Sequence, residues 1–468
     1  MRFLKNTLAI LVQLLALSSC IKEDFTISKK TEGEGWIELY FGASPSVEIS
    51  TKATQGYGAE NGISNIYAFI FDSNGNKVYG KWMTSNERKQ SISEVNSSST
   101  DAWYVNNGTS SSSPTSGCMK IKASSGTEFK IYLITNLDSD MVRISSDLLS
   151  HNISSEDDLL DFRLILNQET VSRNTNFPMV GVMKNISITE NSSSGINSAS
   201  NPLMLKRLDA KVRFKFKTGN RTDENGQKIS KFTAYQWKVV NVPTTSYAIE
   251  RDADLTAKNP KLSEDDYRKS APYYFDTNWR NFEEETTTTQ EFSFYTMENI
   301  LPPKNDTFTS YNDRSRQTKT TSGLNKTIHV DYTTFQGKSK SKDILIFENA
   351  NDFSTYVLVT GHVDMILDND DAGQTLGADV QYMIHLGNWG SNIAPDGQIW
   401  KDDKYDNIHD FSTLRNHSYT YTVTVNSVNN IRVEVEDGFT ENQPGATGDV
   451  VIAKEEIALC DAHYVSKT

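Results

Sequence analysis

Hydrophobic and polar residues alternate with a period of two along much of the chain, a pattern typical of strands that bury one face. The first such run covers residues 36–41, near the N-terminus. Its two faces consist of Ile37, Leu39 and Phe41 on one side and Trp36, Glu38 and Tyr40 on the other. The run therefore predicts a complete amphipathic strand early in the chain.

The same alternation recurs in many later segments. The run 63–71 leads into the sequence Asp-Ser-Asn-Gly-Asn at 72–76, which is typical of a hairpin turn, and 77–83 then returns. In 203–216, the apolar side chains of the second half share one face, and they are Val212, Phe214 and Phe216. Further strands are expected at 129–135, 234–241, 292–297, 344–347, 355–363, 378–386, 418–426 and 431–436.

One segment, 154–166, has the spacing of a helix. Ser155 can cap its start, and Leu159, Phe162 and Leu166 recur at intervals that place them on one side. Acidic residues in the first turn suit the positive end of a helix dipole. We therefore expect a helix over 154–166.

Polar segments separate the expected strands. The stretches 85–126, 250–290 and 302–342 are expected to be loops or insertions, and the Asn- and Ser-rich stretch 185–201 is the expected domain boundary. Many short strands with long insertions and little helix predict an all-β fold made of β-sandwich modules.

The charge balance excludes one class of partner. The 468 residues include 47 Lys and Arg against 60 Asp and Glu, so the formal net charge is −13. No long basic run interrupts this acidic balance, and nucleic acid is therefore not expected as a partner. Aromatic residues make up 10% of the chain, which favours strands over a helical bundle.

The N-terminus has the pattern of an export signal. Arg2 and Lys5 precede an apolar stretch at 8–17, and two serines then precede Cys20. The ending Leu-Ser-Ser-Cys resembles a bacterial lipoprotein box, in which the cysteine becomes the first residue and carries the lipid. The alternative is an ordinary secretory signal with an incidental cysteine. We expect residues 1–19 to be a lipoprotein signal peptide and Cys20 to be lipidated, which anchors the chain in the outer membrane.

Two further cysteines remain, Cys118 and Cys460. They could pair in an oxidising compartment, but they lie far apart in the sequence, and two unpaired thiols are the expected state.

The sequence contains none of the common catalytic motifs. No His-Glu-x-x-His pair and no Gly-x-Ser-x-Gly elbow occurs. His362 and Asp364 share a strand face and could meet His385, although strand histidines are more often structural. The acidic turn 368–373 lacks an oxygen ligand at the fifth position of a calcium loop, where Ala372 stands. We expect no catalytic site, no metal site and no cofactor.

Four stretches together resemble the fimbrillin superfamily, the lipoprotein pilins of type V fimbriae. They follow one another along the chain in the family's order, and they are the lipobox at Cys20 with the run 36–41 and Ser-Thr-Lys-Ala at 50–53; the hairpin 63–75 with Tyr-Leu-Ile-Thr-Asn at 132–136; Phe-Pro-Met-Val-Gly at 177–181 with the segment 203–212; and Arg-Asn-His-Ser-Tyr-Thr-Tyr at 415–421.

The resemblance implies two β-sandwich-like (transthyretin-like) domains and assembly by donor-strand exchange. In such assembly a protease removes the first strand, and a strand of the next subunit fills the groove. The implied division is a tether and removable first strand at 20–52, an N-terminal sandwich at 53–200 and a C-terminal sandwich with a tail at 201–468. The removable strand comprises Trp36, Ile37, Leu39, Tyr40 and Phe41.

The implied processing site lies between Lys52 and Ala53, where the family's best-known protease prefers arginine. The length of the chain and its irregular tail after residue 449 resemble tip or accessory subunits. The implied partners are other fimbrial subunits, the outer membrane and a surface receptor, which gives a role in adhesion. Two other readings stay open: a surface lipoprotein that binds a glycan or another ligand without polymerising, and a secreted hydrolase.

Overall fold

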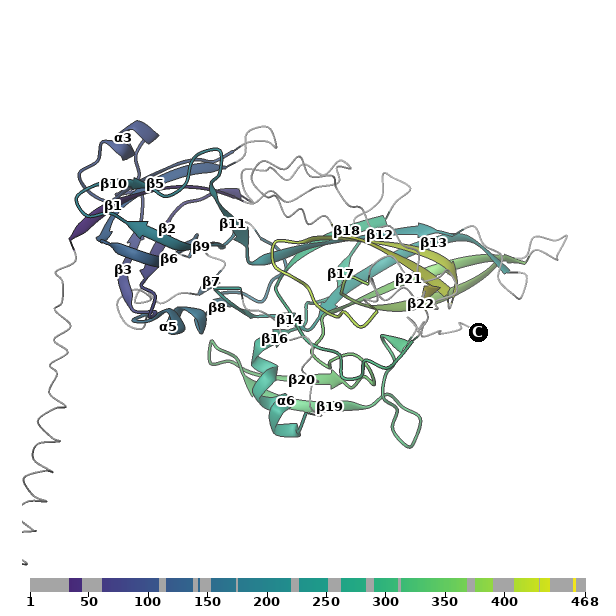
Figure 1. The fold of residues 1–468 in the computed structure, drawn as a ribbon. Coiled ribbons are helices and arrows are strands. Elements are labelled where there is room, and N and C mark those ends of the chain that lie inside the picture. The colour runs from purple at the N-terminus through teal and green to yellow at the C-terminus, as the bar shows by residue number, and fades with distance from the viewer. Residues whose placement is uncertain are drawn as a thin grey trace, which may run out of the picture.

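The computed structural model consists of two β-rich units that lie side by side (Figure 1). The residues that it describes are 33–43, 61–108, 115–137, 142–143, 153–173, 176–219, 227–250, 262–282, 290–309, 313–367, 375–389, 408–428, 430–437 and 458–459. The expected all-β class is confirmed, because strands dominate both units and the helices are short.

The first unit is a nine-stranded sheet with the order β3-β2-β6-β9-β11-β1-β5-β4, in which β10 also pairs with β1. Its strands are β1 (Glu34–Ala43), β2 (Ile66–Phe71), β3 (Lys77–Met83), β4 (Ala102–Asn106), β5 (Ser116–Ser124), β6 (Gly126–Thr135), β9 (Met179–Ile188), β10 (Ser193–Gly195) and β11 (Leu203–Arg207). The first half of β11 pairs with β1 and its second half with β9, so β11 joins two layers. Apolar side chains from both layers form one buried cluster between them, as in a β-sandwich.

The hairpin expected at 63–83 is confirmed. The strands β2 and β3 pair in antiparallel fashion, and Gly75 between them has a φ of 80° that favours glycine. The loop expected at 85–126 is wrong, because the helix α3 (Ile92–Asn96) and the strands β4 and β5 lie within it. Pairing of β5 with β1 from Glu34 to Gly42 stabilises a segment whose composition is too polar to predict a strand.

The helix expected at 154–166 is half wrong. Ser155 caps α5 (Glu156–Leu160) in a reciprocal capping box with Asp158, as its sequence predicts. The helix then stops, and the strand β8 (Arg163–Leu166) follows. It pairs with β7 (Val142–Arg143) and with β15 (Thr245–Tyr247) of the second unit, so a tertiary partner overrides the helical spacing.

The second unit is built around two sheets with the orders β18-β12-β23-β24-β25 and β17-β13-β21-β22. Their strands are β12 (Asp209–Thr218), β13 (Gln227–Val240), β17 (Arg280–Asn281), β18 (Gln290–Met297), β21 (Tyr356–Leu367), β22 (Thr375–His385), β23 (Ser418–Ser427), β24 (Asn430–Asp437) and β25 (Ala458–Leu459). The face expected to be buried in β12 is confirmed, because Val212, Phe214 and Phe216 are at most 1% exposed. Trp237 of β13 stacks on Phe292 of β18, with ring centroids 4.1 Å apart, and so joins the two sheets.

The long segments 250–290 and 302–342, which the sequence predicts to be loops or insertions, contain helices and strands. Their described parts hold α6 (Glu264–Ser270), the 3-10 helix η1 (Ala271–Tyr273), β16 (Tyr274–Phe275), β17, β19 (Thr327–Thr333) and the first part of β20 (Ser339–Leu345), and β16 pairs with β14 (Val242–Pro243). A small apolar cluster that includes Tyr267, Val330 and Ile344 holds α6 against the β19–β20 hairpin. Figure 1 shows this subdomain below the second unit.

The chain passes from the first sheet to the second at Leu208, which is fully buried. We expected the second domain to begin at residue 201, but β11 is hydrogen bonded within the first sheet. Two hydrogen bonds fix the junction: Nη1 of Arg207 donates to Oδ1 of Asn61 at 2.6 Å, and the Arg207 backbone N–H donates to Oδ1 of Asn416 at 3.2 Å.

Candidate functional site: the seat of the first strand

The strand expected at 36–41 lies in the interior of the first sheet as part of β1. It pairs in antiparallel register with β5 from Glu34 to Gly42 on one edge. On its other edge it runs parallel to β10, opposite residues 36–38, and to β11, opposite residues 41–43. A strand from the start of the chain therefore has neighbours on both sides.

The two faces of β1 are those that the alternation predicts. Ile37, Leu39 and Phe41 are fully buried in the apolar cluster between the two layers. On the opposite face, the ammonium of Lys120 lies 5.0 Å from the centre of the Trp36 ring, and Tyr40 packs beside the buried Cys118. The inner face of β1 is thus an integral part of the core.

The ring of Phe41 occupies space that only a glycine on β5 leaves open. A Cβ atom on Gly117 would lie 2.3 Å from Cζ of Phe41 and 2.6 Å from the backbone oxygen of Tyr104. Both distances are far shorter than a van der Waals contact. We call the place of β1 in the sheet, between β5 on one edge and β10 and β11 on the other, its seat. This seat contains a recess above Gly117 that accepts an aromatic ring.

Between β10 and β11 the backbone of β1 is held by a side chain. The Tyr40 N–H donates to Oδ1 of Asn197 at 2.7 Å, and Nδ2 of Asn197 donates to the Tyr40 carbonyl at 2.8 Å. A planar amide with one donor and one acceptor can act as one unit of a strand. Asn197 lies in the Asn- and Ser-rich stretch that we interpreted only as a boundary, and its spacing gave no signal of this role.

Two of the stretches that carry the fimbrillin resemblance meet at Asn136, which has a φ of 61°. Its Oδ1 accepts hydrogen bonds from the backbone N–H and the hydroxyl of Ser64. Its Nδ2 donates to the carbonyls of Gly62 and Phe177. Asn136 is therefore a buried hydrogen-bonding centre that joins these two stretches.

The fourth stretch has a similar role in the second unit. Arg415 is 3% exposed and binds the carboxylate of Glu298 through two nitrogens, at 2.8 and 3.0 Å. It also donates to the carbonyls of Tyr247 and Ala248. Arg415 thereby fixes the segment around β15 and the residues that follow β18.

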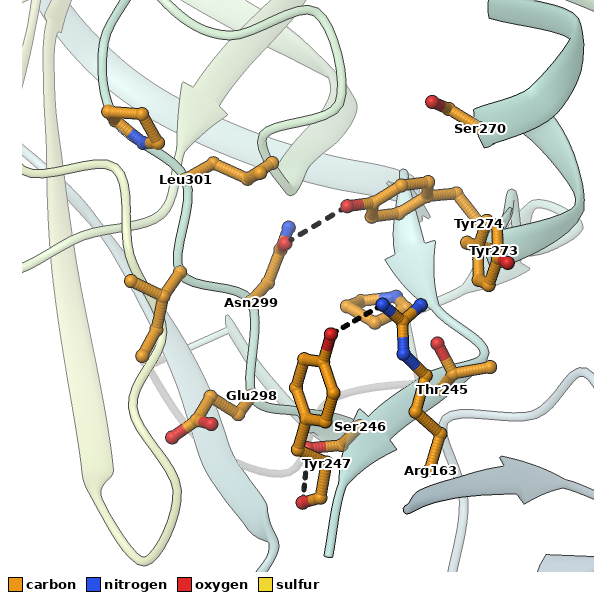
Figure 2. A pocket seen from close by; sticks show the side chains of 13 residues that line it. Arg163, Thr245, Ser246, Tyr247, Ser270, Tyr273, Tyr274, Glu298, Asn299 and Leu301 are labelled. Carbon is orange, nitrogen blue, oxygen red and sulfur yellow. Dashed lines mark hydrogen bonds between the residues drawn. The ribbon is translucent and has the colours of Figure 1, made fainter. Parts of the chain in front are cut away.

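That segment lines a cavity of about 490 Å³ (Figure 2). Three tyrosines, Tyr247, Tyr273 and Tyr274, contribute to its wall together with Glu298. The Arg163 guanidinium carbon lies 4.5 Å from the ring centre of Tyr247 and 5.4 Å from that of Tyr273, and its Nη2 donates to the Tyr247 hydroxyl. Rigid aromatic walls with fixed polar groups are typical of small-ligand sites.

The histidines considered as metal ligands do not meet. His362 Nδ1 lies 2.7 Å from Asp379 and its Nε2 3.5 Å from Asp364, on the sheet formed by β21 and β22. His385 is buried elsewhere, 2.9 Å from the hydroxyl of Ser315. In the part of the chain that the structure describes, no three His, Cys, Asp or Glu residues are grouped so as to hold a metal ion.

Of the other predicted sites, Cys20, Lys52, Ala53, the turn 368–373 and Cys460 lie outside the described residues. Cys118 is a free, buried thiol. Burial, helped by the nearby carboxylate of Glu38, raises the pKa of Cys118 to about 12. Within the described ranges, no helix is long and apolar enough to cross a membrane.

This geometry defines a class of protein. It is a β-sandwich protein whose core includes the N-terminal strand β1. Residues 43–231 match the family model described as "Major fimbrial subunit protein (FimA)", which confirms the resemblance to fimbrillins. The match supports a fimbrial or adhesive role, a place in a cell-surface fimbrium and interaction with other fimbrial components. It also indicates a structural protein.

Three fimbrial proteins are among the solved structures that the comparison matched to this chain. The C-terminally truncated tip fimbrial protein Mfa3 of Porphyromonas gingivalis is 12% identical, with a TM-score of 0.44 and coverage of 86% of this chain and 99% of that one. A fimbrial assembly protein of Parabacteroides distasonis is 8% identical, with a TM-score of 0.34 and coverage of 90% and 99%. The fimbrial anchor protein Mfa2 of P. gingivalis is 8% identical, with a TM-score of 0.29 and coverage of 85% and 97%. A comparison with curated proteins found no match.

Proposed function

We propose that the chain is a subunit of a cell-surface fimbria whose first strand is exchanged for a strand of another subunit. In this proposal it is exported as a lipoprotein through Cys20 and cleaved between Lys52 and Ala53. The observation that carries the proposal is the interior position of β1, which is paired on both edges and precedes the proposed cleavage site in the sequence.

The energetics support an exchange rather than a simple loss. Loss of β1 exposes the apolar surface that covers Ile37, Leu39 and Phe41, and full burial of each such side chain contributes about 1.5–3 kcal/mol. It also leaves the backbone groups of β5, β10 and β11 without a neighbour. An open groove of this kind is best filled by an added strand, which is β-augmentation.

N-terminal sequencing of fimbriae sheared from cells tests the proposal. Incorporated protein is expected to begin at Ala53, and Lys52→Gln is expected to stop incorporation while the precursor stays folded at the surface. Lys231→Gln, at an exposed position of β13, is the matched control and should assemble normally. Sheared material that still contains residues 36–41 contradicts strand exchange at this end of the chain.

We further propose a position for the subunit within the filament. The inserted segments that contain α6, β19 and β20 favour a tip or accessory position with a role in adhesion. Immunogold labelling of whole cells should then mark filament ends or scattered points. Uniform labelling along the filament contradicts this position and indicates a stalk subunit.

The cavity around Tyr247 favours a second candidate, a surface lipoprotein that binds a glycan or another ligand without polymerising. Tyrosine rings beside fixed polar side chains suit the alternating apolar and hydroxyl faces of a sugar. Binding of a purified monomer to a sugar array, lost in Tyr247→Ala, together with an absence of the protein from sheared fimbriae, would favour this candidate over strand exchange.

A further inference from the structure

Lys342 is a lysine on the inward face of a strand. It lies in β20, where Ser341 and Asp343 on either side are exposed but Lys342 is only 8% exposed. Its ammonium nitrogen lies 2.7 Å from Oδ1 of Asn241 and 2.7 Å from Oδ1 of Asp276. Lysine is almost never buried without a partner, and here an amide and a carboxylate are both in contact with it.

Asn241 presents its carbonyl to this lysine in a fixed orientation. The residue is 2% exposed and lies between β13 and β14 with a φ of 57°. Its Nδ2 donates to the backbone carbonyls of Asp352, at 2.8 Å, and of Ser354, at 3.3 Å. These two bonds hold the amide so that Oδ1 faces Lys342.

Asp276 completes the group and belongs to the turn after β16. Its Oδ1 accepts hydrogen bonds from Lys342 and also from the Asn241 backbone N–H at 3.0 Å. Its side chain is 29% exposed, so the carboxylate joins the buried pair to solvent. An amine, an amide carbonyl and a carboxylate thus lie within hydrogen-bond distance in one place.

The environment favours the neutral form of the amine. Burial is the main cause that lowers the pKa of Lys342, and Lys238 nearby acts in the same direction, whereas Asp276 opposes them. A desolvated lysine beside a carboxylate can transfer its proton and become a nucleophile. The same carboxylate then holds a proton close to the amide.

We propose that Lys342 and Asn241 join in an autocatalytic intramolecular isopeptide bond, with Asp276 as the proton carrier. Asp276 accepts a proton from the Lys342 ammonium, and the neutral Nζ attacks Cγ of Asn241. The Nζ–Cγ bond forms and the Cγ–Nδ2 bond breaks. Asp276 passes the first proton to Nδ2, which leaves as ammonia, and the restored carboxylate then takes the second proton from Nζ and releases it to solvent, to which it is 29% exposed. No oxidant, reductant or cofactor is required.

The bond ties the β19–β20 hairpin to the end of β13, a strand of the second sandwich. Figure 1 shows β14 and β16 between this sandwich and the hairpin. Asn241 and Lys342 lie far apart in the sequence, and a cross-link between such residues restricts the unfolded chain strongly. It therefore fastens the subdomain that contains α6, β19 and β20 to the rest of the unit.

Intact-mass measurement of the purified full chain tests the proposal. The protein is expected to be about 17 Da lighter than the mass calculated for the same processed form, which is the mass of the ammonia lost when an amine displaces the amide nitrogen. Tandem mass spectrometry of a digest should find one branched peptide that joins the segments around Asn241 and Lys342. A protein at the calculated mass without a branched peptide overturns the proposal.

Two variants locate the chemistry. Lys342→Arg keeps the charge but lacks the nucleophilic amine, and Asp276→Asn keeps the shape but cannot carry a proton, so both are expected at their calculated masses. A mass deficit that persists in Lys342→Arg overturns the assignment of the bond, and one that persists in Asp276→Asn overturns the role of Asp276. The branched peptide of the unmodified sequence decides the proposal even where a variant fails to fold.

Discussion

The side-chain amide of Asn197 makes both backbone hydrogen bonds of Tyr40, at 2.7 and 2.8 Å, in the gap between β10 and β11. It thereby replaces one peptide unit of a neighbouring strand. Any strand that occupies the place of β1 meets the same donor, Nδ2 of Asn197, and the same acceptor, its Oδ1, at the position of Tyr40. Asn197 thus belongs to the surroundings of β1 and not to β1 itself.

Asn197→Ala is expected to loosen β1 without altering the second unit. The change removes two hydrogen bonds and leaves the Tyr40 N–H and carbonyl without protein partners, a loss of about 1–3 kcal/mol. The melting temperature of the first unit should fall by several degrees, measured by calorimetry of the full chain. Asn74→Ala, in an exposed turn, is the control, and equal melting curves for the two variants contradict the role of Asn197.

Gly117 and Phe41 are expected to be energetically coupled. A methyl group at Gly117 meets the Phe41 ring, so Gly117→Ala should destabilise the protein by about 1–3 kcal/mol through overpacking. Phe41→Ala should destabilise it by about 3–5 kcal/mol, because it opens a cavity in the core. Because Phe41→Ala removes the clash with the ring but not the one with the Tyr104 carbonyl, the double variant should recover part of the loss and be more stable than the sum of the single losses predicts, by about 0.5–3 kcal/mol. Urea unfolding of the four proteins measures this coupling, and additive losses contradict it.

Cys118 is expected to report whether β1 is in place. It lies on β5 opposite Tyr40, and burial raises its pKa to about 12, so the thiolate form that reacts is scarce at neutral pH. Maleimide labelling at Cys118, followed by peptide mapping, should be slow in the intact precursor and faster in Asn197→Ala. Rapid labelling of the precursor contradicts a firmly seated β1.

The pKa of His329 is expected to lie above the ordinary histidine value near 6.5. Its hydrogen bond to Asp343 is the main cause that raises its pKa, and the carboxylate of Asp331 adds to it. A raised folded-state pKa means that the stabilising pair is fully present below the unfolded value and is lost as pH rises through the folded value. An NMR titration of the imidazole checks this, and Asp343→Asn should lower the midpoint. A midpoint that does not change in Asp343→Asn contradicts the assignment.

Cys20→Ser is expected to release the protein from the membrane fraction. The acyl chains on this cysteine are the membrane attachment that the sequence indicates, and each buried CH₂ group contributes about 0.8 kcal/mol to anchoring. Detergent-phase partitioning of the variant measures the effect. Partitioning identical to that of the unaltered protein contradicts lipidation as the anchor.

The local features of the molecule could be predicted from the sequence. The period of two predicted β1, the inner face of β12 and the hairpin at Gly75, because side chains of a strand alternate and turns need particular backbone angles. Where local spacing and tertiary pairing disagreed, as in β8 and β5, the prediction was wrong. Those segments became strands because a partner strand was available.

What only the tertiary structure decided is which distant residues meet. Asn197 beside Tyr40, and Lys342 beside Asn241 and Asp276, are contacts between segments far apart in the chain. Periodicity shows which face of a strand is buried but not which strand covers it. The amino-acid sequence by itself thus determined the class of fold and the amphipathic first strand. The seat of that strand, the tyrosine-lined cavity and the buried lysine arose from packing, because their energies depend on pairs of residues and not on any one segment.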